Sequence, residues 1–132
     1  MNTEASTLPI LDVLHMEVPL SGVHISRTPE PCYHVIFRIC MHNASDISVR
    51  LKGRKWLLRD SSGQSRIIEA EHVFNQCPVL APGAVYSYSG CQSFTMPPVN
   101  MEVRFFGEDQ RGIPFISPAL IFPRHMLRIP HA

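Results

Sequence analysis

Short runs of alternating apolar and polar residues, separated by turn-forming residues, extend along most of the chain. The clearest run is YHVIFRICMH, residues 33–42, in which Val35, Phe37 and Ile39 lie on one side of an extended segment. A period of two is typical of a strand with one buried face. Few windows have a helical period, and twelve prolines are spread along the chain, so the pattern disfavours long helices.

Seven further segments are predicted as strands because each combines apolar residues with flanking turn chemistry. They are residues 11–18, 47–51, 55–59, 65–70, 84–89, 100–107 and 113–122. Strands at intervals of about ten residues are typical of an all-β sandwich or barrel. Residues 19–31, PLSGVHISRTPEP, are predicted to form a long loop between the first two strands. A loop of that length could carry a binding function, and a mobile connection without one explains it equally well.

Three turns contain a glycine at the position where a tight connection requires a positive φ. They are Asp60–Gly63, Pro82–Gly83 and Glu108–Gly112. In the strand after Pro82–Gly83, alternation places Tyr86 and Tyr88 on one side.

Two adjacent phenylalanines, Phe105 and Phe106, fall inside one predicted strand. Successive side chains in a strand point to opposite faces of the sheet, so the two rings cannot both be in the core. We expect one of them to be exposed or to be covered by a partner.

Composition narrows the class of protein. The 132 residues carry a net charge of +1, and 45% are apolar without any run long enough to span a membrane. We predict one soluble domain at residues 11–123, with loosely held ends at 1–10 and 124–132. The near-neutral charge gives no general attraction to nucleic acid or membranes. The N-terminus lacks a secretory signal pattern, so we expect a cytoplasmic protein.

Cysteine spacing indicates neither disulfides nor zinc. None of the four cysteines forms a CxxC pair, and a cytoplasmic chain keeps its thiols reduced. We therefore expect Cys32, Cys40, Cys77 and Cys91 to be free, with Cys91 as a small packing residue and Cys77 incidental.

In its order of motifs, the middle of the chain resembles an ApaG-type domain, and the resemblance extends over roughly residues 11–123. The motifs are Arg54-Lys55-Trp56 (the family usually has Arg-His-Trp), the Asp60–Gly63 turn, Pro78–Gly83, Tyr88 and Gly90-Cys91. The resemblance implies an immunoglobulin or fibronectin type III-like β-sandwich of about seven or eight strands, in agreement with the strand spacing. It also implies a link to magnesium and cobalt homeostasis and a glycine-rich segment proposed to hold phosphates.

The glycine-rich segment is the main departure from the family pattern. Its three glycine positions correspond here to Ala70, His72 and Asn75. Glycines allow backbone amides to approach phosphate oxygens and to adopt positive φ, so their loss removes the usual basis for phosphate binding.

Five residues are candidates for ligand binding. Arg54 and Trp56 share one strand face and could offer a guanidinium and an aromatic plane, although we favour Trp56 as a core anchor with Arg54 over its ring. Glu71, His72 and Asn75 lie in or beside the altered glycine segment. Glu69, Glu71 and His72 could also ligate a divalent cation, but charges that keep a strand edge soluble explain them more simply.

Several arginines in the first two thirds of the chain could form an anion-binding patch if the fold brings them together. They are Arg27, Arg38, Arg50, Arg54, Arg59 and Arg66. A solvated face is the simpler interpretation, because spacing alone does not bring them together.

We predict a non-catalytic binding module for a protein or peptide, with no cofactor and no resident metal, because no nucleophile or acid–base constellation is visible. The alternative is binding of pyrophosphate-containing nucleotides, with or without a divalent cation. A hydrolase acting on nucleotide polyphosphates is a third hypothesis. Pairing of sheet edges into a homodimer is also compatible with the pattern.

Overall fold

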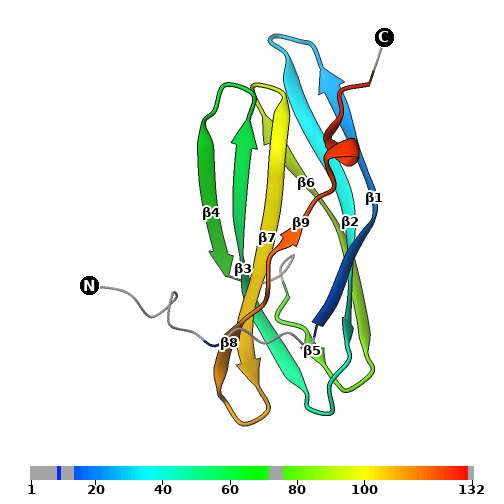
Figure 1. Ribbon diagram of the computed structural model, residues 1–132, viewed down its shortest axis with the longest axis vertical. Helices are drawn as coiled ribbons and strands as arrows, with labels where there is room; N and C mark the ends of the chain where they lie inside the picture. The colour runs from blue at the N-terminus through cyan, green and yellow to red at the C-terminus, as the bar shows by residue number, and fades with distance from the viewer. Residues whose placement is uncertain (1–8, 10–13, 72–75, 131–132) are drawn as a thin grey trace, which may run out of the picture.

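The computed structural model describes residues 9, 14–71 and 76–130, and these residues form two antiparallel sheets packed face to face (Figure 1). One sheet has the strand order β1-β2-β6, and the other has the order β4-β3-β7-β8, with β5 paired to β3 and β9 paired to β7. The strands are β1 (Leu14–Ser26), β2 (Cys32–Asn43), β3 (Val49–Asp60), β4 (Ser65–Glu71), β5 (Val79–Leu80), β6 (Val85–Phe94), β7 (Pro98–Asp109), β8 (Pro114–Ile116) and β9 (Leu120–Ile121). The predicted β-sandwich is confirmed.

Strand β1 continues through most of the segment that was predicted to be a loop. Its residues pair with β2 from Leu14 to Ser26, and the register shifts between Glu17 and Leu20. Pro19 lies in this bulge, and proline cannot donate to a ladder. The extra residue shifts the alternation, so that the inward-facing positions change from even-numbered to odd-numbered residues. A search for one uninterrupted period of two therefore misses the second half of the strand. The loop prediction was therefore wrong for residues 19–26, and only residues 27–31 connect the two strands.

Strand β3 is continuous where two strands, 47–51 and 55–59, were predicted. Its register with β7 shifts between Leu51 and Gly53, so Lys52 is an extra residue. Val49 and Leu51 are buried before the bulge, and Trp56 and Leu58 are buried after it. The bulge again changes the alternating phase, which explains the apparent break in the sequence pattern.

The predicted strand 113–122 is divided into β8 and β9, because Ser117 and Pro118 interrupt it. The buried Ser117 takes part in β7 pairing with its side chain, since the N–H of Phe105 donates to Ser117 Oγ at 2.8 Å. Ser117 N–H donates back to the carbonyl of Phe105 at 2.7 Å. Pro118 has no N–H with which to continue the ladder.

An aromatic cluster fills the space between the sheets. The ring centroid of Phe37 in β2 lies 5.2 Å from Trp56 in β3 and 5.4 Å from Phe122. Gly90 in β6 makes room for it, because a Cβ at this position would lie 2.6 Å from the Phe37 ring. Cys91, expected to be a packing residue, is exposed; its glycine neighbour makes the close contact instead. All four cysteines are free, as predicted.

Asn43 connects three chain segments at one end of the sandwich. Its side chain is fully buried, and Nδ2 donates to the carbonyls of Ile47 and Leu80 at 2.8 and 2.9 Å. Its Oδ1 accepts from the N–H and hydroxyl of Ser45. Its backbone N–H donates to Ala84 O, and its carbonyl accepts from Gly83 N–H. Every polar group of the residue is satisfied, as burial of an amide requires.

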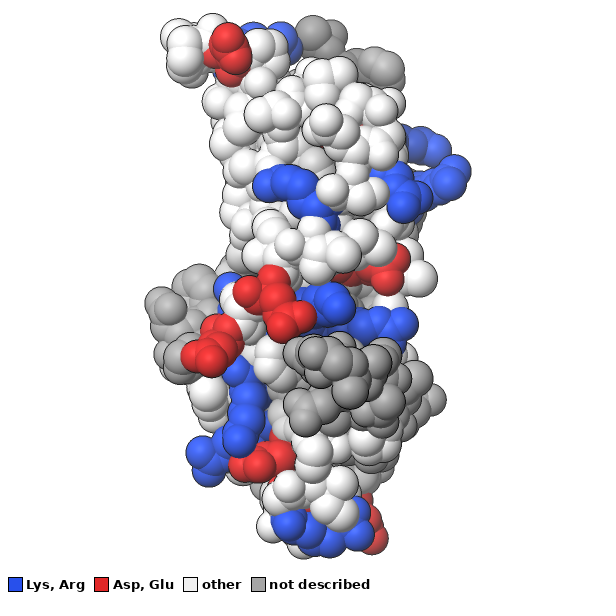
Figure 2. Space-filling view, turned by 90° about the vertical axis from the view of Figure 1, so that its left-hand side faces the viewer, with Lys and Arg blue, Asp and Glu red and all other residues white. Residues whose placement is uncertain are grey.

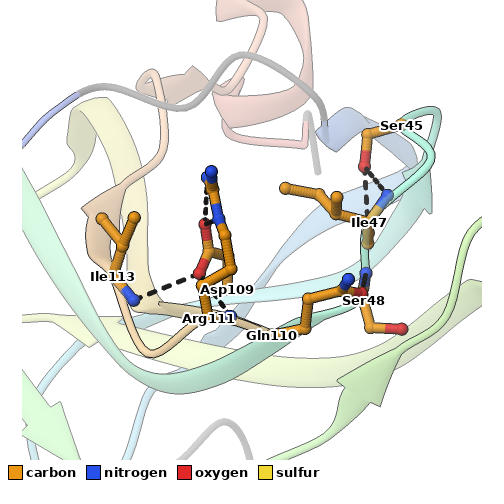
Figure 3. A network of polar contacts seen from close by, with 7 residues as sticks. All are labelled: Ser45, Ile47, Ser48, Asp109, Gln110, Arg111 and Ile113. Atoms are coloured by element: carbon orange, nitrogen blue, oxygen red, sulfur yellow. Dashed lines mark hydrogen bonds and ion pairs between the residues drawn. The ribbon is translucent and has the colours of Figure 1, made fainter.

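A second polar network closes the neighbouring turn between β7 and β8 (Figure 3). Oδ1 of Asp109 accepts from the backbone N–H groups of Arg111 and Ile113, and Oδ2 accepts from the Arg111 guanidinium at 2.7 Å. Gln110 then joins this turn to the 43–48 loop, because its Oε1 accepts from Ser48 N–H at 2.9 Å.

Each of the three predicted turns contains a glycine with positive φ. The φ angles of Gly63, Gly83 and Gly112 are 88°, 80° and 81°. The predicted positions of the turns are therefore confirmed, and the glycines are there for conformational reasons.

The C-terminal segment is packed farther than predicted. Residues Arg124–Leu127 form a short 3₁₀ helix, η1, and Leu127 is only 4% exposed within the core cluster. The predicted loose tail at 124–132 is therefore too long. The predicted N-terminal segment at 1–10 lies outside the described residues except for Pro9, whose carbonyl accepts from Ile116 N–H. In the described ranges, no helix is long and apolar enough to cross a bilayer.

Replacing Asn43 with alanine should destabilise the fold by about 3 kcal/mol, because the carbonyls of Ile47 and Leu80 lose their donor and the loop around Ser45 loses its acceptor. Urea denaturation measures this change. Ser45→Ala is the milder control, since the amide keeps its carbonyl partners. A loss below about 1 kcal/mol for Asn43→Ala would contradict the proposed anchoring role.

Asp109 should make stability depend on pH. The hydrogen bond from the Arg111 side chain, together with backbone N–H groups, holds the pKa of Asp109 below its ordinary value of 3.8. A carboxylate with a depressed folded pKa stabilises the protein above its unfolded pKa, and the contribution is lost as pH falls through the folded pKa. Asp109→Asn should therefore unfold at a lower urea concentration than wild type at pH 7, and the difference between the two urea midpoints should become smaller below about pH 4. A difference that stays constant down to about pH 2 would exclude this linkage.

Candidate functional site

Arg54 and Trp56 lie on the same face of β3, as predicted, and this is the inner face. Trp56 is 1% exposed and packs against Phe37 and Phe122, so its role as a core anchor is confirmed. Arg54 is half-buried between the sheets near Tyr88. Burial raises the pKa of Tyr88 above its ordinary value, and the Arg54 charge opposes this shift. Ligand binding by either β3 residue stays a prediction.

The altered glycine segment begins inside a strand. Ala70, at the first of the three glycine positions, belongs to β4 and pairs with Arg54. Glu71 is the exposed last residue of that strand. His72 and Asn75 lie outside the described residues, so the structure does not test their candidate roles.

The six arginines do not form one patch. Arg38 lies on the outer face of the three-stranded sheet and donates to Ser87. Arg54 is on the inner face of the other sheet, while Arg66 donates to the carbonyl of Ser93. Among the residues that the structure describes, no group of three or more His, Cys, Asp or Glu residues could hold a metal ion.

A pocket of about 440 Å³ lies where β3, β7 and β8 meet the end of β4. It combines an aromatic and aliphatic floor with charged groups at its rim. The lining residues are Arg50, Lys52, Glu71, Cys77, Phe106, Gly107, Glu108, Pro114 and Phe115.

The β3 bulge and a glycine shape this pocket. With Lys52 as the extra residue, both it and Arg50 are exposed on the outer face. Phe106 is the outward-facing member of the predicted Phe105–Phe106 pair, and its ring lies across Gly53. A Cβ at Gly53 would be 2.3 Å from Phe106 Cζ and 2.6 Å from the carbonyl oxygen of Ala70. The ring can lie flat on the sheet because that position has no side chain.

The rim carries balanced charges. Lys52 Nζ lies 3.2 Å from a carboxylate oxygen of Glu108, and both side chains are partly exposed. Arg50 and Glu71 supply one further charge of each sign. Figure 2, which looks at the β4 side of the molecule, shows basic and acidic side chains mixed without a field of one sign. Such a site presents apolar surface together with donors and acceptors for either charge.

Sequence reasoning missed most of this pocket. Of its lining residues, Glu71 was a candidate, Arg50 was considered only as part of the arginine patch, and Phe106 was suspected of exposure. The pocket depends on register, since Arg50 is opposite Glu108 and Gly107 is opposite Phe115. The adjacent phenylalanines were the one signal that pointed to it.

The family model described as the ApaG domain matches residues 24–108, from within β1 to the end of β7. The chain belongs to the ApaG domain family. The match includes most of the β-sandwich and all of β3, β4 and β6.

Curated relatives of this ApaG-domain protein carry the name Protein ApaG. The one from Vibrio atlanticus is 31% identical over 97 residues, covering 71% of this chain and 77% of the relative. The one from Acidovorax sp. is 30% identical over 98 residues, covering 74% and 71%. The one from Methylococcus capsulatus is 24% identical over 110 residues, covering 81% and 87%.

Solved structures have the same fold. A structural-genomics target determined by X-ray crystallography matches with a TM-score of 0.78 at 20% identity, covering 92% of this chain and 96% of that one. A Bordetella pertussis protein named ApaA matches with a TM-score of 0.68 at 19% identity, covering 86% and 94%. These likenesses establish the sandwich fold.

Gly53→Ala should destabilise the protein by about 2 kcal/mol, because the added methyl group meets both Phe106 and the β4 backbone. Gly22→Ala is the matched control, since a Cβ there has nothing within 4 Å and its backbone is not in the left-handed region. The control should be as stable as wild type or slightly more stable. Equal denaturation midpoints for the two variants would show that the space between Gly53 and the Phe106 ring accommodates a methyl group.

Proposed function

We propose that this ApaG-domain protein is a non-catalytic module that binds a segment of another protein, and that the pocket receives one of the segment's side chains. The observation that carries the proposal is the composition of the pocket. Phe106, Pro114 and Phe115 supply apolar surface, and the charged rim has both signs. The apolar part of the lining suits an apolar side chain of the bound segment, and the charged rim suits the polar groups beside it.

The positions of the perturbed ionisable groups support a non-catalytic role. Catalytic acids and bases often have shifted pKa values and lie in a cleft. Here the pKa of Asp60 is lowered by Ser62, and that of Asp109 by Arg111, both within turns. Burial raises the pKa values of Tyr86 and Tyr88. All four groups lie outside the pocket and have structural explanations.

Binding of a pyrophosphate-containing nucleotide is the alternative, and Arg50 is the observation that favours it. Its guanidinium lies at the pocket and takes part in none of the ion pairs formed between described residues. Against this hypothesis, Glu71 and Glu108 share the same rim and would repel phosphate. The partner hypothesis accommodates all four charges.

Selection from a library of random twelve-residue peptides should yield binders that depend on the pocket. Phe106→Ala should weaken a selected peptide about tenfold, as expected for loss of an aromatic contact at the centre of a site. Lys52→Ala and Arg59→Ala form a matched pair, because both residues are basic and on β3 but only Lys52 lines the pocket. Only the Lys52 variant should lose affinity by fluorescence polarisation.

Pyrophosphate and ADP, with and without Mg²⁺, serve as competitors in the same assay. Competition that disappears in Arg50→Ala would favour the nucleotide hypothesis. Peptides that bind wild type and Phe106→Ala equally would contradict the assignment of this pocket.

A further inference from the structure

Strand β4 is an edge of the larger sheet, and no described strand pairs with its outer side. It pairs with β3 on one side, from Ser65 opposite Arg59 to Glu71 opposite Gly53. It is the last strand in the order of this sheet as far as the structure is described. Figure 1 shows it at the outer side of the molecule. Alternate N–H and C=O groups along such an edge are available for pairing with another strand.

Two of the three charged side chains of β4, Arg66 and Glu69, are directed away from this edge. Arg66 reaches toward the other sheet, where it donates to Ser93 O at 2.6 Å and lies 5.5 Å from the centre of the Phe94 ring. Glu69 lies 4.0 Å from Lys55 on β3. Both charges are engaged with the body of the sandwich. They therefore lie on opposite faces of the sheet, and between them no described strand pairs with the backbone edge.

The outer face of β4 leads from an apolar residue into the pocket. Ile67, Glu69 and Glu71 alternate on this face, as the Lys55–Glu69 contact and the pairing of Ile67 with Leu57 indicate. Ile67 is 65% exposed, and Glu71 lines the pocket. The two are separated by four residues of strand, or about 13 Å. One extended segment lying along β4 would reach both.

We propose that the β4 edge and the end of the pocket at Glu71 form one binding site, which takes an extended segment of another protein as an additional strand. Main-chain hydrogen bonds to the edge would provide affinity, and alternate side chains would provide specificity. Residues directly opposite one another share a face of the sheet. The partner should place an apolar residue opposite Ile67, a basic residue opposite Glu69, and an apolar residue opposite Glu71 at the pocket.

This pattern, apolar-x-basic-x-apolar, reads the same in both directions. It therefore applies to parallel and antiparallel addition. The inference rests on the proposed function but names the partner's conformation and the spacing of its side chains, which the pocket alone does not define.

The probe is the capped, fluorescein-labelled peptide Thr-Ser-Val-Thr-Lys-Thr-Val-Ser-Thr, measured by anisotropy with the full chain. Wild type should bind it saturably, and Ile67→Lys should weaken binding about tenfold, because a charge replaces the apolar contact and repels the peptide lysine. Ile121→Lys is the matched control, since Ile121 is an exposed isoleucine of β9, at the other side of the same sheet. Its affinity should stay within about twofold of wild type.

Backbone methylation of the probe tests the strand geometry itself. N–H groups of alternate residues point to the same edge of a strand. One peptide carries N-methyl groups at its third and fifth residues, and the other at its fourth and sixth. One of the two should lose binding and the other should keep most of it. Equal affinities would overturn strand addition.

The outcomes separate this inference from the proposed function. Binding that is sensitive to Phe106→Ala but not to Ile67→Lys or to methylation would overturn edge addition while leaving the pocket as the binding site. If the fluorescein-labelled peptide does not bind but the library-selected peptides do, edge addition is likewise overturned and the pocket remains the binding site. A wild-type dimer in sedimentation analysis that Ile67→Lys converts to a monomer would show that a second copy occupies the edge, and would overturn the proposal.

Discussion

The contact between Phe37 and Trp56 is the constraint on which the rest of the structure depends. It joins the two sheets at a centroid distance of 5.2 Å and requires Gly90 beneath the Phe37 ring. With Trp56 directed inward, Arg54 must also face inward, and Lys55 must face outward. Residues Val49 and Leu51 also need the core, so the phase of β3 must change between them and Trp56. Lys52 supplies that change as a bulge.

The pocket follows from this constraint. The same bulge places Arg50 and Lys52 outside while their neighbours fill the core. Gly53 then accommodates Phe106 on the outer surface. The pocket and the core therefore lie on opposite faces of β3, so a substitution that shifts the register of β3 would change both.

The sequence allowed the sandwich, its turns and its core anchor to be predicted, because these depend on local alternation and on glycines with positive φ. The bulges at Pro19 and Lys52 could not be predicted in the same way, since an added residue reverses the pattern without leaving a turn signal. The site was harder still. Arg50, Phe106 and Pro114 come from three strands, and only their register brings them together.

The altered glycine segment begins within the β4 edge. The resemblance implies a glycine at the position of Ala70, and in this chain Ala70 continues a regular strand to Glu71. An alanine has a Cβ and fewer accessible backbone conformations, so it favours a defined strand over a loop that wraps an anion. The residue that departs from the glycine pattern is therefore also part of the β4 edge.

Asn43 also affects how the chain can be modified. Asn43-Ala44-Ser45 matches the acceptor pattern for N-linked glycosylation. The nitrogen to which a glycan would be attached is Nδ2, and both of its hydrogen bonds are made inside the fold, to Ile47 and Leu80. A sugar could be attached only before the chain folds, and the glycosylated chain could not then close this end of the sandwich. In the folded protein, Asn43 is therefore not available as a glycosylation site.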